Sequence, residues 1–181
     1  MAMRKALYTI ASGRHEELWR SVAQPTWELF CRRHGYELHC FSEPLDRSER
    51  ANGRSIAWQK LIVHEHLEPY DLAIWLDADI VINPSCPDPA PSLQSGRVGC
   101  CLEFTWGDDP QTAYLAASWR RKQQQTFASV GIAFESYQKL WGFEPSAGPL
   151  INTGFLMFRP AETGSLLRHV YDTYDDRDVS H

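Results

Sequence analysis

Apolar and polar positions alternate along this chain in short runs that predict strands and helices in turn. Lys5–Ala11 and Tyr36–Phe41 are rich in residues that favour strands, and glycine or serine lies close to each run. Leu72–Leu76 is an unbroken apolar run, which is typical of a strand buried on both faces. We therefore expect strands at these places, separated by helical segments.

The first helical segment is His15–His34, which carries apolar residues at helical spacing and stops at Gly35. Pro25 falls inside this segment and is expected to kink or split the helix, because proline has no backbone N–H to donate. The residues expected to face the core are Leu18, Val22, Leu29 and Phe30.

Later segments follow the same two patterns. Ser55–Leu67 and Glu162–Tyr174 have helical spacing, whereas Arg97–Phe104 and Leu150–Phe158 have the composition of strands. Gly154 lies inside the last strand, where a glycine marks either a structural bulge or the close approach of a ligand. The residues expected to face inward are Ile56, Leu61, Val63 and Leu67 of the first helix and Leu166, Leu167 and Val170 of the second.

The alternation of strands and helices predicts an α/β fold, with an open, mostly parallel sheet and helices on both faces. The chain has 181 residues, of which 43% are hydrophobic, so it can bury the core of one domain spanning residues 1–181.

Two carboxylates follow the apolar run Leu72–Leu76. Asp77 and Asp79 are separated by one residue, so on extended backbone both would point to the same side. Two like charges so close together repel each other, and a divalent cation between them would relieve that cost. Carboxylate oxygens suit Mg²⁺ or Mn²⁺. The open alternative is a loop in which the acids only cap a helix or face solvent, but ligands of open α/β sheets bind at this end of the strands.

Composition excludes several classes of function. The net charge of −5 argues against a general nucleic-acid binder, and no apolar run approaches the roughly 20 residues of a membrane span. The start of the chain lacks the pattern of a signal peptide. Five cysteines, an odd number without a Cys-x-x-Cys pair, argue against a disulfide framework or zinc site and favour a reducing compartment, the cytoplasm. The cysteines expected in the core are Cys31, Cys40, Cys100 and Cys101.

Three stretches together resemble a known family. They are Trp58-Gln59-Lys60-Leu61, then WLDADIVINP from Trp75 to Pro84, then INTGFLMFRP from Ile151 to Pro160. In this order they resemble the nucleotide-sugar-dependent glycosyltransferases of the GT-A (Rossmann-like) fold. The resemblance is closest to the galactosyl-, mannosyl- and xylosyltransferase family and weaker to the glycogenin-like family. It covers about residues 4–175.

The resemblance implies roles for residues of this chain. Lys60 would offset charge on the donor diphosphate or on Asp77, and its replacement is expected to change folding little, because a lysine ammonium is rarely buried unpaired. The alternative is a solvent-facing lysine on an amphipathic helix. Ser12 and Gly13 would meet the nucleotide; the alternative is an ordinary strand-to-helix turn in which one of them caps the helix. Arg47, Arg50 and Arg54 could meet phosphate or be solvated residues of a charged loop.

The resemblance also implies a full set of site residues. The implied metal ligands are Asp77 and Asp79. The implied donor-binding residues are Thr9, Ser12, Gly13, Trp58, Lys60 and Ala78, and the implied catalytic residues are Asp77, Asp79 and Asn152.

The activity implied is the Mn²⁺- or Mg²⁺-dependent transfer of a hexosyl or pentosyl group from a nucleoside-diphosphate sugar to a glycan, lipid or protein acceptor. Both families retain configuration, so retention is expected. Inversion would need a carboxylate base, for which Glu103, Asp108 or Asp109 could serve, and Trp106 could line an acceptor pocket.

Two other functions remain open. The acidic-Gln segment and later histidine of the family are absent, so we expect the domain to lack its C-terminal part, and the chain could be an inactive GT-A-like binding or assembly protein. A HAD-like phosphatase also begins its site with Asp-x-Asp. Its nucleophile, however, lies near the chain start, whereas Asp77 follows two earlier strands.

Overall fold

A computed structural model of the chain describes residues 3–66, 70–102, 113–114, 117–118, 121, 125 and 151–174. The chain divides into two compact units, Met1–Cys101 with Thr153–Thr173 and Leu102–Asn152 with Tyr174–His181. The sheet and the helices described below belong to the first unit. The exceptions are Leu102, the last residue of one strand, and Ile151 and Asn152, the first two residues of another.

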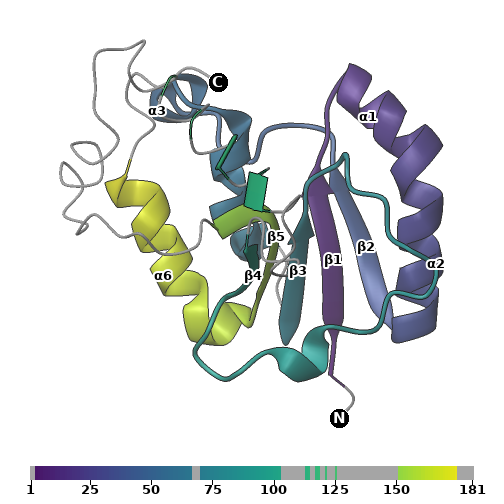
Figure 1. The fold of residues 1–181 in the computed structure, drawn as a ribbon. Helices are drawn as coiled ribbons and strands as arrows, with labels where there is room; N and C mark the ends of the chain where they lie inside the picture. Colours follow the sequence, from purple (N-terminus) through teal and green to yellow (C-terminus); the bar gives the residue numbers. More distant parts are fainter. Residues whose placement is uncertain are drawn as a thin grey trace. The chain divides into compact units, whose positions relative to one another are not determined.

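The first unit is built on a five-stranded sheet with the order β2-β1-β3-β5-β4. Strand β1 pairs in parallel with both β2 and β3, and β5 runs antiparallel to β3 (Figure 1). The open, mostly parallel sheet expected from the sequence is therefore confirmed. The strands are β1 (Lys5–Ile10), β2 (Tyr36–Phe41), β3 (Leu72–Leu76), β4 (Gly99–Leu102) and β5 (Ile151–Phe158).

Alternate side chains of the strands enter two separate cores. Leu7, Ile74 and Met157 pack into one core, whereas Tyr8 and Trp75 pack into the other. Because every residue of β3 is buried, the sheet must be covered on both faces.

One face of the sheet is covered by a continuous helical rod, seen beside β2 in Figure 1. It consists of α1 (Arg14–Leu18), a π-helical turn η1 (Trp19–Ala23) and α2 (Gln24–His34). The π turn ends two residues before Pro25, and the Gln24 N–H donates to the carbonyl of Trp19, five residues back. The wider turn accommodates the proline, which cannot donate a backbone hydrogen bond, so the expected kink takes this form.

The buried face of this rod differs from the expected one. Phe30 is buried as expected, but Leu18, Val22 and Leu29 are exposed. The rings of Trp19 and Trp27 pack edge to face with centroids 5.6 Å apart, and they fill the space under the rod. Large aromatic rings bury more apolar area than the aliphatic residues they displace, which explains the rotation of the helix. The residues that face the core are Trp19, Ala23, Trp27, Phe30 and Cys31.

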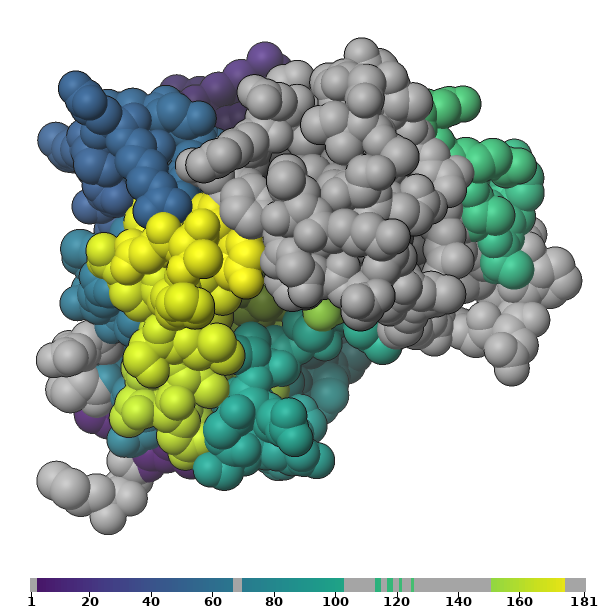
Figure 2. All heavy atoms as spheres, turned by 90° about the vertical axis from the view of Figure 1, so that its left-hand side faces the viewer, coloured from purple at the N-terminus to yellow at the C-terminus, as the bar shows by residue number. Residues whose placement is uncertain are grey.

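The other face is covered by short 3-10 turns and one long helix. The expected helix Ser55–Leu67 is instead two 3-10 segments, η2 (Ile56–Leu61) and η3 (Val63–His66), preceded by the short helix α3 (Glu49–Asn52). Helix α6 (Pro160–Thr173) packs against η2 and η3, and Figure 2 shows it in yellow beside the blue segment that carries α3.

Several inward-facing residues on this side were assigned wrongly. Ile56 and Leu166 are exposed, whereas Val63 and Leu167 are buried against the sheet as expected. Leu67 lies outside the described residues. A further 3-10 turn, η4 (Ala90–Ser92), lies in the loop after β3.

Strand β5 runs without a bulge. Its register with β3 is regular from Phe158 to Phe155, and the Asp77 N–H then donates to the Gly154 carbonyl at 2.8 Å. The structural bulge considered at Gly154 is therefore absent, because the glycine continues the ladder.

The five cysteines are free thiols. Cys31 is buried as expected, but Cys101 is exposed, so its expected place in the core was wrong. Among the described residues, no helix is long and apolar enough to cross a membrane.

Candidate functional site

Three segments that are distant in the sequence meet at one edge of the sheet. Strands β1 and β3 are parallel, so their carboxyl ends lie at the same edge, and the antiparallel β5 begins there. The Ser12–Gly13 loop follows β1, and the Asp77–Asp79 segment follows β3. Thr153 lies near the start of β5. Such an edge is where open α/β sheets bind their ligands.

The two aspartates lie in a turn and not on extended backbone. The Ile80 N–H donates to the Asp77 carbonyl at 3.1 Å and closes the turn. The two carboxylates therefore do not share one face of a strand, as we expected from alternation, since the chain leaves the sheet after Leu76. The turn exposes the side chain of Asp79 and leaves Asp77 and Ala78 half-buried.

Lys60 holds Asp77 from η2. Its ammonium lies 3.2 Å from Oδ1 of Asp77 and donates to the Thr153 carbonyl at 3.0 Å, with the Thr153 hydroxyl at 3.4 Å. Lys60 is only 6% exposed, so the solvent-facing alternative is excluded. Its replacement cannot leave folding untouched, because a buried ammonium and its acceptors form part of the structure.

Trp75 is a second donor to the same carboxylate, and sequence reasoning did not identify it. Its indole Nε1–H donates to Oδ1 of Asp77 at 2.7 Å, and the ammonium of Lys60 lies 5.2 Å from its ring centroid. The sequence pattern that could have identified this contact is a tryptophan two residues before an aspartate at the end of a strand. Within the described residues, Oδ2 of Asp77 accepts no hydrogen bond, so one oxygen is held and the other keeps its lone pairs for a ligand.

Gln59, the middle residue of the Trp-x-Lys stretch, fixes a neighbouring loop. Its buried side chain accepts from the Leu45 and Asp46 N–H groups and donates to the Asp46 carbonyl at 2.9 Å. Adjacent residues of η2 thus hold two different segments, with Gln59 on the loop and Lys60 on the Asp77 turn.

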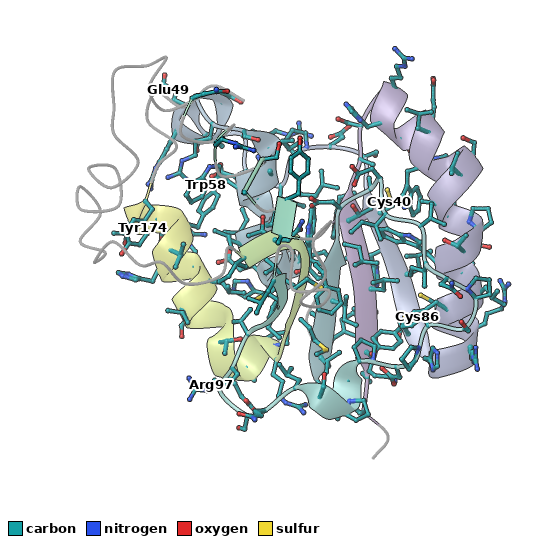
Figure 3. All side chains as sticks on the ribbon, viewed as in Figure 1. Cys40, Glu49, Trp58, Cys86, Arg97 and Tyr174 are labelled. Atoms are coloured by element: carbon teal, nitrogen blue, oxygen red, sulfur yellow. The ribbon has the colours of Figure 1, made fainter. Side chains whose placement is uncertain are left out.

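Trp58 lies half-buried on η2, on the side of the sheet that carries α6 (Figure 3). The Arg54 guanidinium lies 5.0 Å from its ring centroid and 4.9 Å from that of Tyr171. Arg54 also donates to the Tyr171 carbonyl at 2.9 Å and is buried, so it joins η2 to α6. Arg47 pairs with Glu43 on the surface. For Arg54, the contacts favour a structural role over the phosphate contact we considered.

The end of β1 and the loop after it contain residues in different environments. Thr9 is fully buried in the sheet, and its hydroxyl has no hydrogen-bond partner among the residues that the structure describes. Ser12 and Gly13 are exposed where the chain turns into α1. Gly13 has φ 54°, a conformation that favours glycine, so this turn depends on the residue type.

Asn152 is exposed and precedes Thr153 on β5. Glu103, Trp106, Asp108 and Asp109 lie outside the described residues. No group of three or more His, Cys, Asp or Glu side chains that could hold a metal occurs in the described part of the chain. Asp77 and Asp79 could supply two carboxylate ligands, so a divalent cation here would need further oxygen atoms from water or from a bound substrate.

Comparisons with known proteins identify the fold. No protein-family model matches the chain, and no curated protein matches it. Among solved structures, it is similar to a glycosyltransferase involved in the glycosylation of the major capsid of PBCV-1. The TM-score is 0.52 at 16% sequence identity, over 96% of this chain and 69% of the other. The first unit thus has the open α/β sheet of a GT-A-like glycosyltransferase fold.

Proposed function

We propose that this protein is a glycosyltransferase that transfers a sugar from a nucleoside-diphosphate donor and requires a divalent cation. The observation that carries the proposal is the Asp77–Asp79 turn at the carboxyl end of β3, held by Lys60 to the start of β5. The similarity of fold and the three sequence stretches support the same activity.

The two aspartates are the residues that would hold Mn²⁺ or Mg²⁺. Asp77 would use Oδ2, since Oδ1 is occupied by Lys60 and Trp75, and Asp79 would use its exposed carboxylate. The donor diphosphate would complete the oxygen shell. When bound, the cation supplies Lewis-acid stabilisation of the charge that develops on the departing diphosphate.

The chain's own residues prepare the site for that charge. The buried ammonium of Lys60 keeps Asp77 in place and adds positive potential beside the diphosphate without reorganising. Ser12 and Gly13 lie at the same edge and would contact the nucleotide. Thr9, which is buried, would support the donor-binding edge from within the sheet. Trp58 and Ala78 would lie beside the donor.

The remaining features of the reaction rest on the family resemblance. It supports transfer of a hexosyl or pentosyl group with retention of configuration, to a hydroxyl of a glycan, lipid or protein. Asn152, beside Thr153 at the start of β5, would contact the transferred sugar or the acceptor.

The proposal is tested by calorimetry with uridine, guanosine, adenosine and cytidine diphosphates, each with Mn²⁺, with Mg²⁺ and with chelator. We expect one nucleotide to bind only with the metal, and Asp79→Asn to abolish this binding while the protein stays folded. Binding of equal strength in chelator would contradict the metal site.

Hydrolysis of the matching nucleotide sugar separates an enzyme from an inactive binding protein of the same fold. Slow, metal-dependent release of the sugar, lost in Asp79→Asn, supports the enzyme. Metal-dependent binding without any hydrolysis or transfer supports the binding protein.

A further inference from the structure

The turn that carries the two aspartates is held from both faces of the sheet by buried indole groups. From one face, Trp75 donates to Oδ1 of Asp77 at 2.7 Å. From the other, the Nε1–H of Trp27 in α2 donates to the Ile80 carbonyl at 2.8 Å. The two tryptophans belong to different cores, so the turn is fixed independently at its first and last residues.

We infer that Trp27 is a positioning residue for Asp79, an inference that rests on the proposed metal site. Asp79 has no hydrogen bond or ion pair of its own among the described residues, so only the backbone directs its carboxylate. Ile80, the next residue, has both backbone groups occupied: its N–H bonds to the Asp77 carbonyl at 3.1 Å and its carbonyl accepts from Trp27. A cation bound by two carboxylates needs both held to within a fraction of an ångström.

Two further hydrogen bonds join the segment after Asp79 to α2. The Ile82 N–H donates to the Thr26 hydroxyl at 3.1 Å, and Arg33 donates to the Pro84 carbonyl at 2.8 Å. Ile80 and Ile82 also line an apolar cavity of about 260 Å³ against the sheet. The segment after Asp79 is therefore fastened to α2, and Trp27 makes the contact nearest the aspartates.

Trp19 provides a matched control. It is buried beside Trp27 in the same core, but its indole N–H has no hydrogen-bond partner within the described part of the chain. Replacing either tryptophan with phenylalanine removes one N–H and some ring volume. Only Trp27→Phe also removes a bond to the turn.

The experiment measures Mn²⁺ affinity by electron paramagnetic resonance in the full chain, with the nucleoside diphosphate that binds in calorimetry held at saturation. We expect Trp27→Phe to weaken Mn²⁺ binding about 10-fold, the usual effect of losing a group that orients a metal ligand. Trp19→Phe should bind Mn²⁺ as the wild type does. Urea unfolding of both variants separates this effect from stability, because a purely structural role would lower both stabilities and leave Mn²⁺ affinity unchanged.

A second variant keeps the test decisive if Trp27→Phe does not fold. Thr26→Val removes the bond to the Ile82 N–H at nearly constant shape and should weaken Mn²⁺ binding by a smaller factor. If the folded Trp27→Phe protein binds Mn²⁺ as tightly as the wild type does, the inference is overturned. If Trp27→Phe does not fold, wild-type Mn²⁺ affinity in Thr26→Val overturns it instead. In both cases the proposed function is unaffected. A wild-type protein that binds no nucleotide with any metal overturns both.

Discussion

Lys60 and Asp77, 17 residues apart in sequence, form an ion pair in which the lysine is the buried partner. The side chain of Lys60 is 8% exposed and that of Asp77 is 42% exposed. A buried ammonium requires its acceptors, whereas a half-exposed carboxylate can still hydrate its free oxygen. The pair thus directs one oxygen of Asp77 inward and leaves the other available at the edge of the sheet.

The first prediction concerns this pair. Lys60→Met should lower the free energy of unfolding by about 1–3 kcal/mol, the scale of hydrogen bonds to a charged group. It should also weaken metal-dependent nucleotide binding by about 1–3 kcal/mol, because Asp77 loses its anchor and the diphosphate loses a nearby positive charge. Urea unfolding and calorimetry measure the two effects.

Lys5 is the matched control for Lys60. It pairs with Asp88 at 2.7 Å, but it is the first residue of β1 and lies at the opposite end of that strand from the proposed site. Lys5→Met should lower stability and leave nucleotide affinity unchanged. Equal losses of affinity in both variants would mean that Lys60 acts only through folding.

The second prediction separates the two aspartates. Asp79→Asn should cost no stability, since this exposed side chain makes no hydrogen bond or ion pair among the described residues. Asp77→Asn should destabilise the fold, because it leaves the Lys60 ammonium without its charged partner. Both should abolish metal-dependent binding in calorimetry. Asp71→Asn, at the other end of β3, should not affect it.

The third prediction concerns the packing of α6 on η3. A Cβ added at Gly164 would lie 2.7 Å from Cδ2 and 3.0 Å from Nε2 of His64. Gly164→Ala should therefore destabilise the protein by about 1 kcal/mol, even though alanine favours a helix. Adding His64→Ala should remove most of the clash. Ser165→Ala, exposed on the same helix, should be neutral, and a neutral Gly164→Ala would show that the ring moves freely.

The fourth prediction concerns pH. Burial lowers the pKa of His64 below its usual value near 6.5, although Glu65 beside it acts in the opposite direction. The unfolded chain then binds a proton at a higher pH than the folded protein does. Stability should be fully present above about pH 6.5 and fall as the pH drops toward the lowered pKa of the folded state.

Urea unfolding between pH 5 and 7.5 measures this dependence. His64→Gln should reduce the slope without abolishing it, because burial also lowers the pKa of His39. An unchanged slope in His64→Gln would contradict the prediction.

The sequence alone determined the elements in which local pattern and burial agree. The strands Tyr36–Phe41 and Leu72–Leu76 have the bounds that the sequence predicted, because short runs of strand-favouring residues with polar or turn-forming neighbours favour strands over helices. Their order along the chain, with helices between them, also predicted the open α/β sheet. The position of Asp77 and Asp79 after a buried strand predicted a ligand site at this edge of the sheet, and that site stays a prediction.

Tertiary structure decided which side chains those elements bury. Along residues 14–34 an aliphatic stripe and an aromatic stripe were both possible, and the space against the sheet selected Trp19 and Trp27 over Leu18 and Val22. The burial of Lys60 and its bond to Asp77 depended on how η2 packs on the sheet. The contact between Trp27 and the Ile80 carbonyl joins residues 53 positions apart, and it depended on how α2 packs on the other face of the sheet. Local pattern carries no information about such contacts, because they form only when distant segments pack into one core.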